Sequence, residues 1–340
     1  MATLKDVAQL AGVSTATVSH VINGTKKISA ATTERVLLAI SQVKYRPNTA
    51  AKSLHGGQSN AVGVLVEDIR GLPVADIVSG IADTLSRSGY MMLLYDLHLL
   101  EQLYNQYAMT SSYRERISNG SQLLLSSEID GLIYVGMHDR HLNQLFTPMD
   151  RPLVIAYSHG TAQDTSITYS NFDSAARLTR YLIRKGHQRI AVIAGHPDSY
   201  PSQRRMQGFV SAMHEAGLPI EPEYIRQGNW EADSGAAATR EFLALPHRPT
   251  AIFAMNDLMA AGCYQALSEA GLSIPGDMAV VGFDNRELSA FLQPPLTTVA
   301  LPSKEIGVRA ALRLLDRIHN PATPPVKDIL PCTFMERSSV

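Results

Sequence analysis

The first twelve residues carry apolar positions at helical spacing. Leu4, Val7, Ala8 and Ala11 fall at the i, i+3, i+4, i+7 spacing of one buried helix face. Thr3 can cap the start of this helix together with the residue three positions on, Asp6, and Gly12 can end it. The pattern therefore predicts a short amphipathic helix.

A second apolar run follows after a Gly12-Val13 separator. Ser14 can cap it, and Val18, Val21 and Ile22 face inward. Short or polar side chains remain on the outer face, and these suit close approach to base edges and phosphates. They are Thr15, Ala16, Thr17, Ser19 and His20. Two short helices around a glycine are typical of a helix-turn-helix.

A third helix is predicted from about residue 30 to 45. Ser29 can cap it, and the residue before Pro47 is pushed out of the helical region, which stops the helix there. Pro47 can then open a short helix over 48–54, followed by a flexible joint from Gly56. Composition alone leaves open that 47–60 is a plain linker.

From Ala61 onward, short apolar strands alternate with helices, which predicts parallel sheets covered on both faces. Two such runs predict two α/β lobes with a cleft between them. The expected strands are 61–66, 91–95, 132–135 and 153–156 in the first run, and 190–194, 224–227, 251–254 and 279–283 in the second. The expected helices are 75–88, 172–185, 202–216, 234–244 and 257–270, with glycines 89, 186, 217 and 271 as stops.

The net charge also differs between the N-terminal helical region and the α/β region that begins at Ala61. Residues 1–60 hold seven Lys and Arg against two acidic residues, a net charge of +5. The remaining 23 basic and 29 acidic residues give 61–340 a net charge of −6. A basic head on an acidic body is typical of a DNA-binding module attached to a domain that does not bind DNA.

The rest of the composition narrows the class of protein. With 45% hydrophobic and 18% charged residues the chain is typical of soluble globular proteins, and no apolar run is long enough for a membrane span. We expect a cytoplasmic protein because no signal-peptide stretch opens the chain. Two cysteines make no disulfide framework. Because we find no phosphate loop, nucleophile elbow or zinc-binding HExxH pattern, we expect neither an enzyme nor a cofactor.

The wording of 3–23, TLKDVAQLAGVSTATVSHVIN, resembles the N-terminal signature of the lactose/galactose repressor family, nearest to its purine and ribose repressors. The resemblance extends over essentially the whole chain. It implies a homodimer on a near-palindromic DNA operator, with Thr15, Ala16 and His20 on bases and Thr17, Ser19 and Asn23 on phosphates. It also implies that 47–60 is a hinge helix, in which Leu54, with Lys52 and His55, holds the minor groove.

The resemblance also implies a domain plan: a headpiece over 1–46, the hinge and linker over 47–60, and a core over 61–340 like the periplasmic binding proteins. Its first lobe would cover about 61–159 and 291–321, and its second about 160–290 and 322–340. The chain would cross between lobes near 160, 290 and 322.

Ligands of open parallel sheets bind beyond the carboxyl ends of the strands. Asp284, Asn256, Trp230 and Arg205 follow predicted strands, and together they suit a neutral polar ring. Each has an ordinary alternative as a cap, a surface cation or a core residue. The resemblance assigns these four to the effector and leaves Asp257 as a helix cap.

Three departures from the family pattern put the effector's identity in doubt. Tyr157 stands where an acidic residue is usual, and Leu72-Pro73-Val74, with Asp68 just before, replaces an aromatic pair. We include Asp68 and Tyr157 in the expected effector site. An insert over 97–113 is either a lid or, more in keeping with ordinary folds, an extended helix over its own lobe. His138 and His141 lie three residues apart but no partner completes a metal site, so we assign no metal.

Together these observations predict a dimeric transcription regulator, most simply a repressor, whose DNA binding is controlled by a small-molecule effector between the lobes. A sugar is the expected effector. The alternatives are a nucleobase or nucleoside, a protein co-regulator, and, against the basic head, a solute-binding receptor.

Overall fold

A computed structural model describes residues 2–23, 26–45, 59–100, 111–142, 145–146 and 149–340. Contacts divide the chain into two compact units, 1–59 and 60–340, and each is described by itself. Among the described helices, none has the length and apolar character needed to cross a bilayer.

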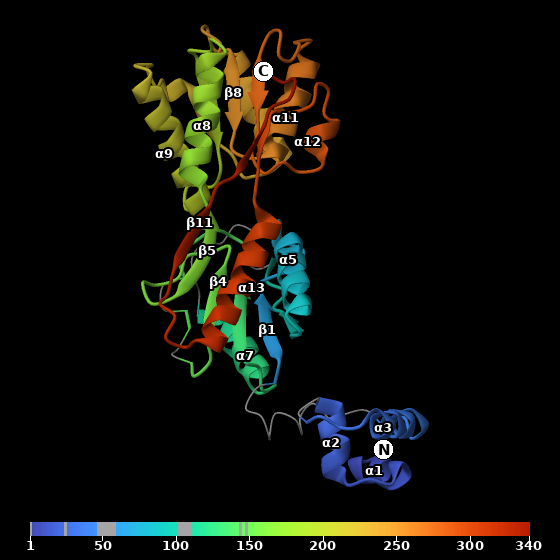
Figure 1. Cartoon of the computed structure of the whole chain (residues 1–340). Coiled ribbons are helices and arrows are strands. Elements are labelled where there is room, and N and C mark those ends of the chain that lie inside the picture. Colours follow the sequence, from blue (N-terminus) through green and yellow to red (C-terminus); the bar gives the residue numbers. More distant parts are fainter. Residues whose placement is uncertain (1, 24–25, 46–58, 101–110, 143–144, 147–148) are drawn as a thin grey trace. The chain divides into compact units, whose positions relative to one another are not determined.

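The described part of the first unit contains three helices, α1 (Leu4–Ala11), α2 (Thr15–Asn23) and α3 (Ala30–Gln42) (Figure 1). The predicted capping box is present: Asp6 N donates to Thr3 Oγ1 at 3.3 Å, and Thr3 N donates to Asp6 Oδ2 at 2.7 Å. Gly12, at φ 62°, ends α1 in the left-handed region that glycine adopts without strain. Ser14 caps α2 by accepting from Thr17 N at 3.1 Å.

The apolar residues of these helices form one small core. Its buried members are Val7, Ala8, Ala11, Val18, Val36 and Ala39. The third helix ends earlier than expected, at Gln42, because Lys44 takes a left-handed conformation at φ 49° and Tyr45 N turns back to Ile40 O at 3.0 Å. The expected stop at Pro47, like the hinge residues Lys52, Leu54 and His55, lies outside the described residues.

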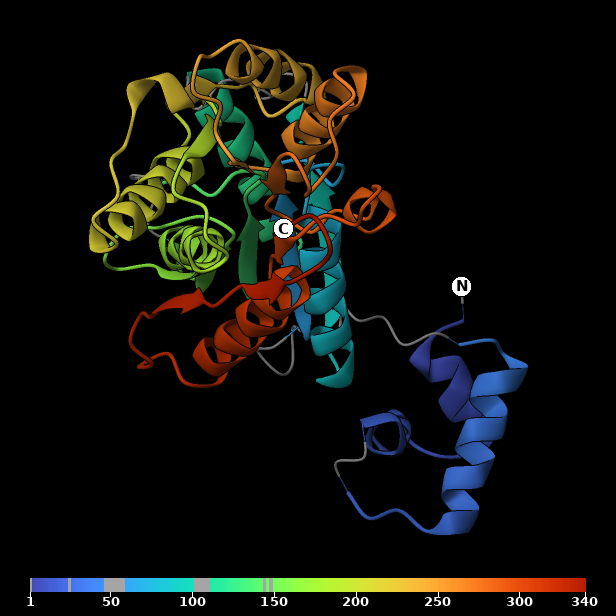
Figure 2. The same ribbon diagram turned by 90° about the horizontal axis from the view of Figure 1, so that it is seen from above.

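The second unit contains a six-stranded parallel sheet in the order β11-β5-β4-β3-β1-β2. Its strands are β1 (Ala61–Val66), β2 (Met91–Asp96), β3 (Gly131–Val135), β4 (Leu153–Ala156), β5 (Thr165–Tyr169) and β11 (Lys327–Leu330). Helices α5 (Val74–Arg87) and α13 (Ser303–His319) lie side by side (Figure 2), and α7 (Ser111–Leu125) also packs on the sheet.

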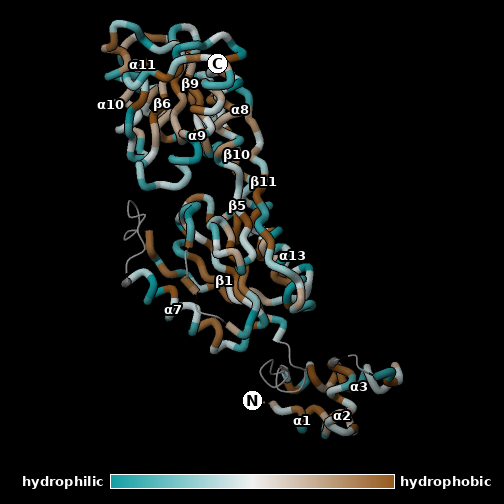
Figure 3. Tube along the Cα trace, turned by 90° about the vertical axis from the view of Figure 1, so that its left-hand side faces the viewer, coloured by the Kyte–Doolittle hydropathy of each residue, from teal (hydrophilic) through white to brown (hydrophobic). Residues whose placement is uncertain are grey.

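The sequence of β1 is apolar throughout because both faces of the strand are buried. Val62, Val64 and Val66 face one hydrophobic cluster, which includes Ile77 of α5, whereas Leu65 faces a second, which includes Ile117 of α7. Figure 3 shows β1 as a hydrophobic segment between α7 and α13. A strand covered on both faces carries a continuous apolar run, which is the pattern seen in the sequence of β1.

A second parallel sheet has the order β7-β6-β8-β9. Its strands are β6 (Ile190–Ala194), β7 (Ile225–Gln227), β8 (Ala251–Ala254) and β9 (Ala279–Val281), and a short 3-10 helix, Pro222–Tyr224, precedes β7. The helices pack as two pairs, α8 with α9 and α10 with α11. They are α8 (Asn171–Arg184), α9 (Tyr200–Glu215), α10 (Ala232–Leu243), α11 (Asp257–Glu269) and the short α12 (Leu288–Phe291).

The strand pairing places the lobe boundaries differently from the expected ones. Strands β5 and β11 lie beyond the expected crossings near 160 and 322, yet both pair in the six-stranded sheet. The antiparallel pair β10 (Thr298–Ala300) and β12 (Thr333–Met335) joins the second sheet through bridges from Val281 to Thr297 and from Asp284 to Ala300. The crossings therefore fall near 170, 301 and 331, because two strands complete the first sheet before the chain leaves it.

Candidate functional site

The outer face of α2 is the candidate DNA-binding surface. Thr15 and Ala16 are exposed, and Thr17, Ser19 and His20 are half-buried, while Val18 is completely buried beneath them. Asn23 is the last residue of the helix, and its side chain lies outside the described part. This alternation leaves short polar side chains outward on a helix anchored by its apolar face, which is the geometry that the spacing predicted.

A cavity of about 340 Å³ lies beyond the carboxyl ends of strands from both sheets. Five of the six expected effector residues line it: Tyr157, Arg205, Trp230, Asn256 and Asp284. Further lining residues include Leu72, Leu100, Met137, Asp139, Tyr169 and Arg286. Parallel strands from two lobes thus bring together residues that lie more than a hundred positions apart in sequence.

Trp230 supplies the large aromatic face of the cavity. A side chain at Gly195 would overlap ring atoms Cζ2 and Cη2 of the indole, so the absence of a side chain there lets the ring lie on the backbone after β6. The guanidinium carbon of Arg205 lies 5.8 Å from the indole centroid. Trp230 itself has φ 74°, a strained conformation for a bulky residue, and such strain is typical of positions that the surrounding structure enforces.

Arg205 of α9 is buried, with only 3% of its surface exposed. Its Nε donates to Asn171 Oδ1 at 2.8 Å, Nη1 donates to the Met255 carbonyl oxygen, and Nη2 donates to the Tyr169 hydroxyl at 3.2 Å. Nη2 also lies 3.4 Å from Asp284 Oδ1. A buried guanidinium needs such partners, and they fix its plane at the cavity wall.

The cap of α11 differs from the expectation. Asn256, and not Asp257, is the N-cap: its Oδ1 accepts from Met259 N at 2.9 Å, while its Nδ2 donates to the Trp230 carbonyl oxygen at 2.8 Å. An amide can accept and donate at once, so Asn256 both starts the helix and holds the tryptophan loop. It still lines the cavity.

Asp257 is buried and ties α11 to the segments after β9. Its carboxylate accepts from Arg286 N at 2.7 Å and from Thr298 Oγ1 at 2.6 Å. Burial, together with the neighbouring charge of Asp284, raises the pKa of Asp257 to about 7. Burial also raises the pKa of Asp284.

Tyr157 lies at the cavity wall, stacked on Tyr169 with ring centroids 5.5 Å apart and an interplanar angle of 11°. Burial raises the pKa of the Tyr157 hydroxyl well above its ordinary value, so it stays protonated and can donate a hydrogen bond at neutral pH. The tyrosine that departs from the family pattern thus replaces a charge with a stacked, neutral hydroxyl.

Asp68 is the expected site residue that does not line the cavity. It is fully buried, and its carboxylate accepts from Arg70 Nε at 3.0 Å, from Arg70 Nη2 at 2.9 Å and from Leu100 N at 2.9 Å. The hydrogen bonds from Arg70 lower the pKa of Asp68 to about 2. Asp68 does not contact the cavity itself, but it fixes the position of the Arg70 side chain, which lines the cavity.

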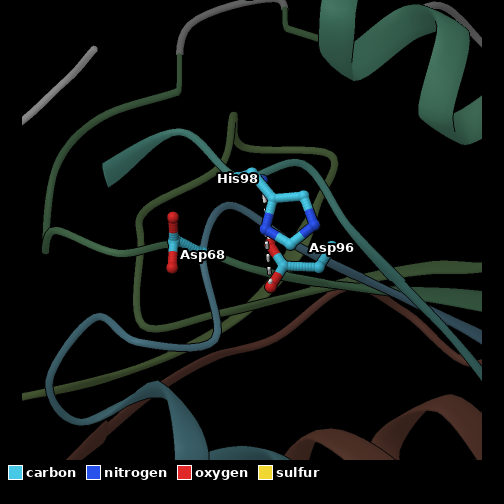
Figure 4. Close-up of side chains that lie close together, drawn as sticks. All are labelled: Asp68, Asp96 and His98. Atoms are coloured by element: carbon cyan, nitrogen blue, oxygen red, sulfur yellow. Dashed lines mark hydrogen bonds and ion pairs between the residues drawn. The ribbon is translucent and has the colours of Figure 1, made fainter. Parts of the chain in front are cut away.

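Asp68 also lies near Asp96 and His98, with one potential metal ligand from each within 4.8 Å of the others (Figure 4). Asp96 Oδ2 accepts from Ile69 N at 3.1 Å and Oδ1 accepts from His98 N at 2.9 Å. The guanidinium of Arg70 neutralises the charge of Asp68, and both carboxylate oxygens of Asp96 accept hydrogen bonds from backbone N–H groups. The geometry therefore fits a hydrogen-bonded loop junction better than a cation site.

Sequence reasoning missed part of the cavity wall. Asp139 lies in a loop and Tyr169 ends β5, and no motif marked either residue, although Asp139 follows an expected strand, as the predicted site residues do. His138, discounted as a metal ligand, lines the cavity, while His141 stacks on His159 with centroids 4.8 Å apart. Neither belongs to a metal-ligand cluster among the described residues.

The insert is described in part. Leu97, Leu99 and Tyr113 are buried, and α7 begins at Ser111. Tyr113 and Tyr134 donate to the buried carboxylate of Glu67, which also accepts from Arg140 Nη2 at 2.6 Å and Met137 N at 2.8 Å. The described end of the insert thus packs into its own lobe; residues 101–110 lie outside the described part, and the choice between lid and cover stays open.

Comparisons with known proteins match both the N-terminal helical region and the α/β region of the chain. Residues 3–48 match the model of the bacterial regulatory proteins of the lacI family, and 179–340 match the periplasmic binding protein-like domain. The HTH-type transcriptional repressor PurR of Actinobacillus pleuropneumoniae serotype 3 (strain JL03) is 38% identical over 321 residues, covering 94% of this chain and 91% of the relative. PurR of Vibrio cholerae serotype O1 (strain M66-2) is 35% identical over 94% of this chain and 92% of its own length.

Two solved structures extend the likeness over the whole chain. The lac repressor dimer bound to operator and the anti-inducer ONPF has a TM-score of 0.81 and 29% identity, covering 99% of this chain and 98% of that one. The transcriptional regulator CelR–cellobiose complex has a TM-score of 0.68 and 30% identity over 100% of both chains.

Proposed function

The chain belongs to the lacI family of bacterial regulatory proteins, and is thus a DNA-binding transcription regulator and not an enzyme; from this premise we propose that it is a repressor controlled by a small-molecule effector. It would bind a near-palindromic operator as a homodimer in the cytoplasm. The observation that carries the proposal is the presence in one chain of an anchored helix with a short polar outer face and a separate cavity lined by charged and aromatic groups.

We propose the DNA-binding roles of α2 from the sequence resemblance, and the exposure of Thr15 and Ala16 supports them. Thr15, Ala16 and His20 would meet base edges in the major groove, and Thr17, Ser19 and Asn23 would hold phosphates. The relatives named as repressors, and the lac repressor solved as a dimer on its operator, support the same assignment. Selection from a random DNA library with the full chain should enrich a palindrome; recovery of random sequences alone, with and without cell extract, would refute the proposal.

The hinge remains a proposal from the sequence resemblance. Leu54, with Lys52 and His55, would enter the minor groove, where opening a base step costs roughly a few kcal/mol that contacts on bent DNA offset. Leu54→Ala should then reduce the bend and weaken operator binding while effector binding stays intact. Unchanged affinity and bend, measured by gel shift on circularly permuted fragments, would defeat the hinge assignment.

For the effector we propose a sugar. Asp139, Asp284 and Asn256 can pair with hydroxyl groups, the Tyr157 hydroxyl stays neutral, and Trp230 offers a face on which a ring can stack. CelR, a structural neighbour, is solved with cellobiose. In this proposal the ligand moves one lobe relative to the other and so changes operator affinity, by the 1–3 kcal/mol typical of such coupling.

A nucleobase or nucleoside is the second candidate, favoured by the motif wording shared with purine repressors and by the single indole face. Calorimetry with a panel of sugars, nucleobases and nucleosides separates the two. If only nucleobases or nucleosides release heat on binding, the effector is a nucleobase or nucleoside and not a sugar. If no compound gives a heat signal but the chain binds a partner protein, the effector is a protein co-regulator.

A further inference from the structure

Asn171 joins two charged residues of the cavity wall through a single amide. Its Oδ1 accepts from Arg205 Nε at 2.8 Å, and its Nδ2 donates to Asp139 Oδ2 at 2.7 Å. All three side chains are at least 95% buried, with exposed fractions of 3%, 3% and 1%. An amide is the side chain of this size that can accept from a guanidinium and donate to a carboxylate at the same time.

The three residues belong to different lobes. Asp139 follows β3 of the six-stranded sheet, and its loop is fastened to that lobe because His159 N donates to Arg140 O and Leu142 N to His159 O, both at 2.8 Å. Asn171 is the first residue of α8, and Arg205 lies in α9, the helix that packs on α8 in the other lobe. The hydrogen bond between Asn171 and Asp139 therefore crosses from one lobe to the other.

An aromatic contact near this hydrogen bond also joins the two lobes. The rings of His141 and His159, stacked on each other in the first lobe, both meet the ring of Tyr200 edge-on, at centroid distances of 4.9 and 5.1 Å. Tyr200 is the first residue of α9. In addition, His159 Nε2 lies 3.0 Å from Asp139 Oδ1, so the aromatic contact and the amide contact share Asp139.

We propose that Asn171 is a positioning residue that latches the two lobes, holding Asp139 and Arg205 together at the cavity wall. Because Asp139 and Arg205 both line the cavity, a ligand that hydrogen-bonds to either one acts on the latch directly. Asn171 is thus the link between cavity occupancy and the approach of the lobes; only this regulatory meaning rests on the proposed function.

The test uses the full chain without DNA or added ligand, at about pH 8, well above the ordinary pKa of an aspartate. Asn171→Asp keeps an acceptor for Arg205 but removes the donor and faces Asp139 with a second carboxylate. Asp139→Asn alone keeps an acceptor for the Asn171 amide. The double variant N171D/D139N exchanges the two groups, so that the amide at 139 can donate to the carboxylate at 171.

Two measurements report on the latch. Hydrogen exchange of peptides over 136–142 and 170–175 reports the local opening, and acrylamide quenching of Trp230, the single tryptophan, reports access to the cavity. N171D should exchange roughly tenfold to a hundredfold faster in these peptides and be quenched more, as expected for a lost buried hydrogen bond. D139N should change little, and the double variant should behave like D139N. Asn320→Asp, the same change at the exposed end of α13, should behave like the wild type.

Wild-type exchange and quenching in N171D would overturn the latch, and so would a double variant as open as N171D. If N171D does not fold, the double variant decides alone: a folded protein with exchange like that of D139N supports the latch, and an unfolded one refutes it. Because no DNA or effector is used, a failed operator or effector assignment leaves this result readable.

Discussion

The guanidinium of Arg205 lies 3.4 Å from the carboxylate of Asp284, and both groups line the cavity. The same guanidinium lies 3.7 Å from the Phe283 ring centroid, so its face is covered by an aromatic ring while its edge is occupied by hydrogen-bond acceptors. The expected effector residues are therefore also a mutually supporting group within the protein. A ligand would join an existing network and compete with its internal bonds.

Arg205→Met should lower the free energy of unfolding by about 3–5 kcal/mol, because it leaves the half-buried Asp284 carboxylate and the buried Asn171 amide without their cation. Denaturant unfolding measures this loss. Arg204→Met, in the same helix turn, removes an exposed hydrogen bond to Gln207 and a contact 5.3 Å from the Phe172 ring centroid, and it should change the free energy of unfolding by about 0.5 kcal/mol or less. Equal losses in the two variants would show that the Arg205 network contributes little.

Trp230 should report on the effector. Its fluorescence should change when the compound that produces heat in calorimetry saturates the protein. Gly195→Ala should displace the indole, since the added methyl would overlap its ring, and should weaken the binding of that compound at least tenfold. Glycine to alanine at Gly276, which is exposed, serves as a control. Silent fluorescence at saturation would remove Trp230 from the binding site.

Asp257 should make stability depend on pH. The folded chain keeps the proton of Asp257 up to about pH 7, whereas the unfolded chain releases it near the ordinary aspartate pKa of about 4. This contribution is fully present below about pH 4 and is lost as the pH rises to about 7, with a slope of at most about 1.4 kcal/mol per pH unit. Asp257→Asn removes it.

The difference in unfolding free energy between D257N and the wild type should therefore shift in favour of the variant between pH 5 and pH 8. Chemical denaturation of both proteins across this range measures the shift. Asp277→Asn, at an exposed aspartate whose pKa is lowered by its hydrogen bonds to Ser273, is the comparison. A constant difference for D257N across the range would mean that Asp257 does not hold a proton near neutral pH.

If residues on the outer face of α2 contact base edges, substituting them should reduce the preference of the protein for its operator sequence over random DNA. Thr15→Ala and His20→Ala should each reduce the affinity for the selected palindrome by about 1–3 kcal/mol, while the affinity for random DNA changes little. Gln9→Ala, on the exposed face of α1, should leave both affinities unchanged. Fluorescence anisotropy at fixed salt measures them, and parallel losses on both DNAs would assign these residues to the backbone instead of the bases.

Local patterns in the sequence determined most of the elements. The caps at Thr3, Ser14 and Ser29 act within one helical turn, and the left-handed glycines 89, 186, 217 and 271 end helices through their own backbone freedom. The buried strands β1, β4, β6 and β8 were predicted at their exact bounds, because each is a continuous apolar run. Such features depend on neighbours in the chain and can be recognised from them.

Only the tertiary structure decided which residues share the cavity and where the lobes divide. Nothing local marks β5 or β11 as partners in the first sheet, because their pairing joins residues about 160 positions apart. Likewise, the cap of α11 passed to Asn256 because the neighbouring Asp257 finds acceptor roles toward Arg286 and Thr298. Asp68 is buried and accepts from Leu100 N, 32 positions away, in addition to its neighbour Arg70, so it does not line the cavity. Asn171 likewise bonds to Asp139 and Arg205, which lie 32 and 34 positions away, and these contacts exist only once the chain has folded.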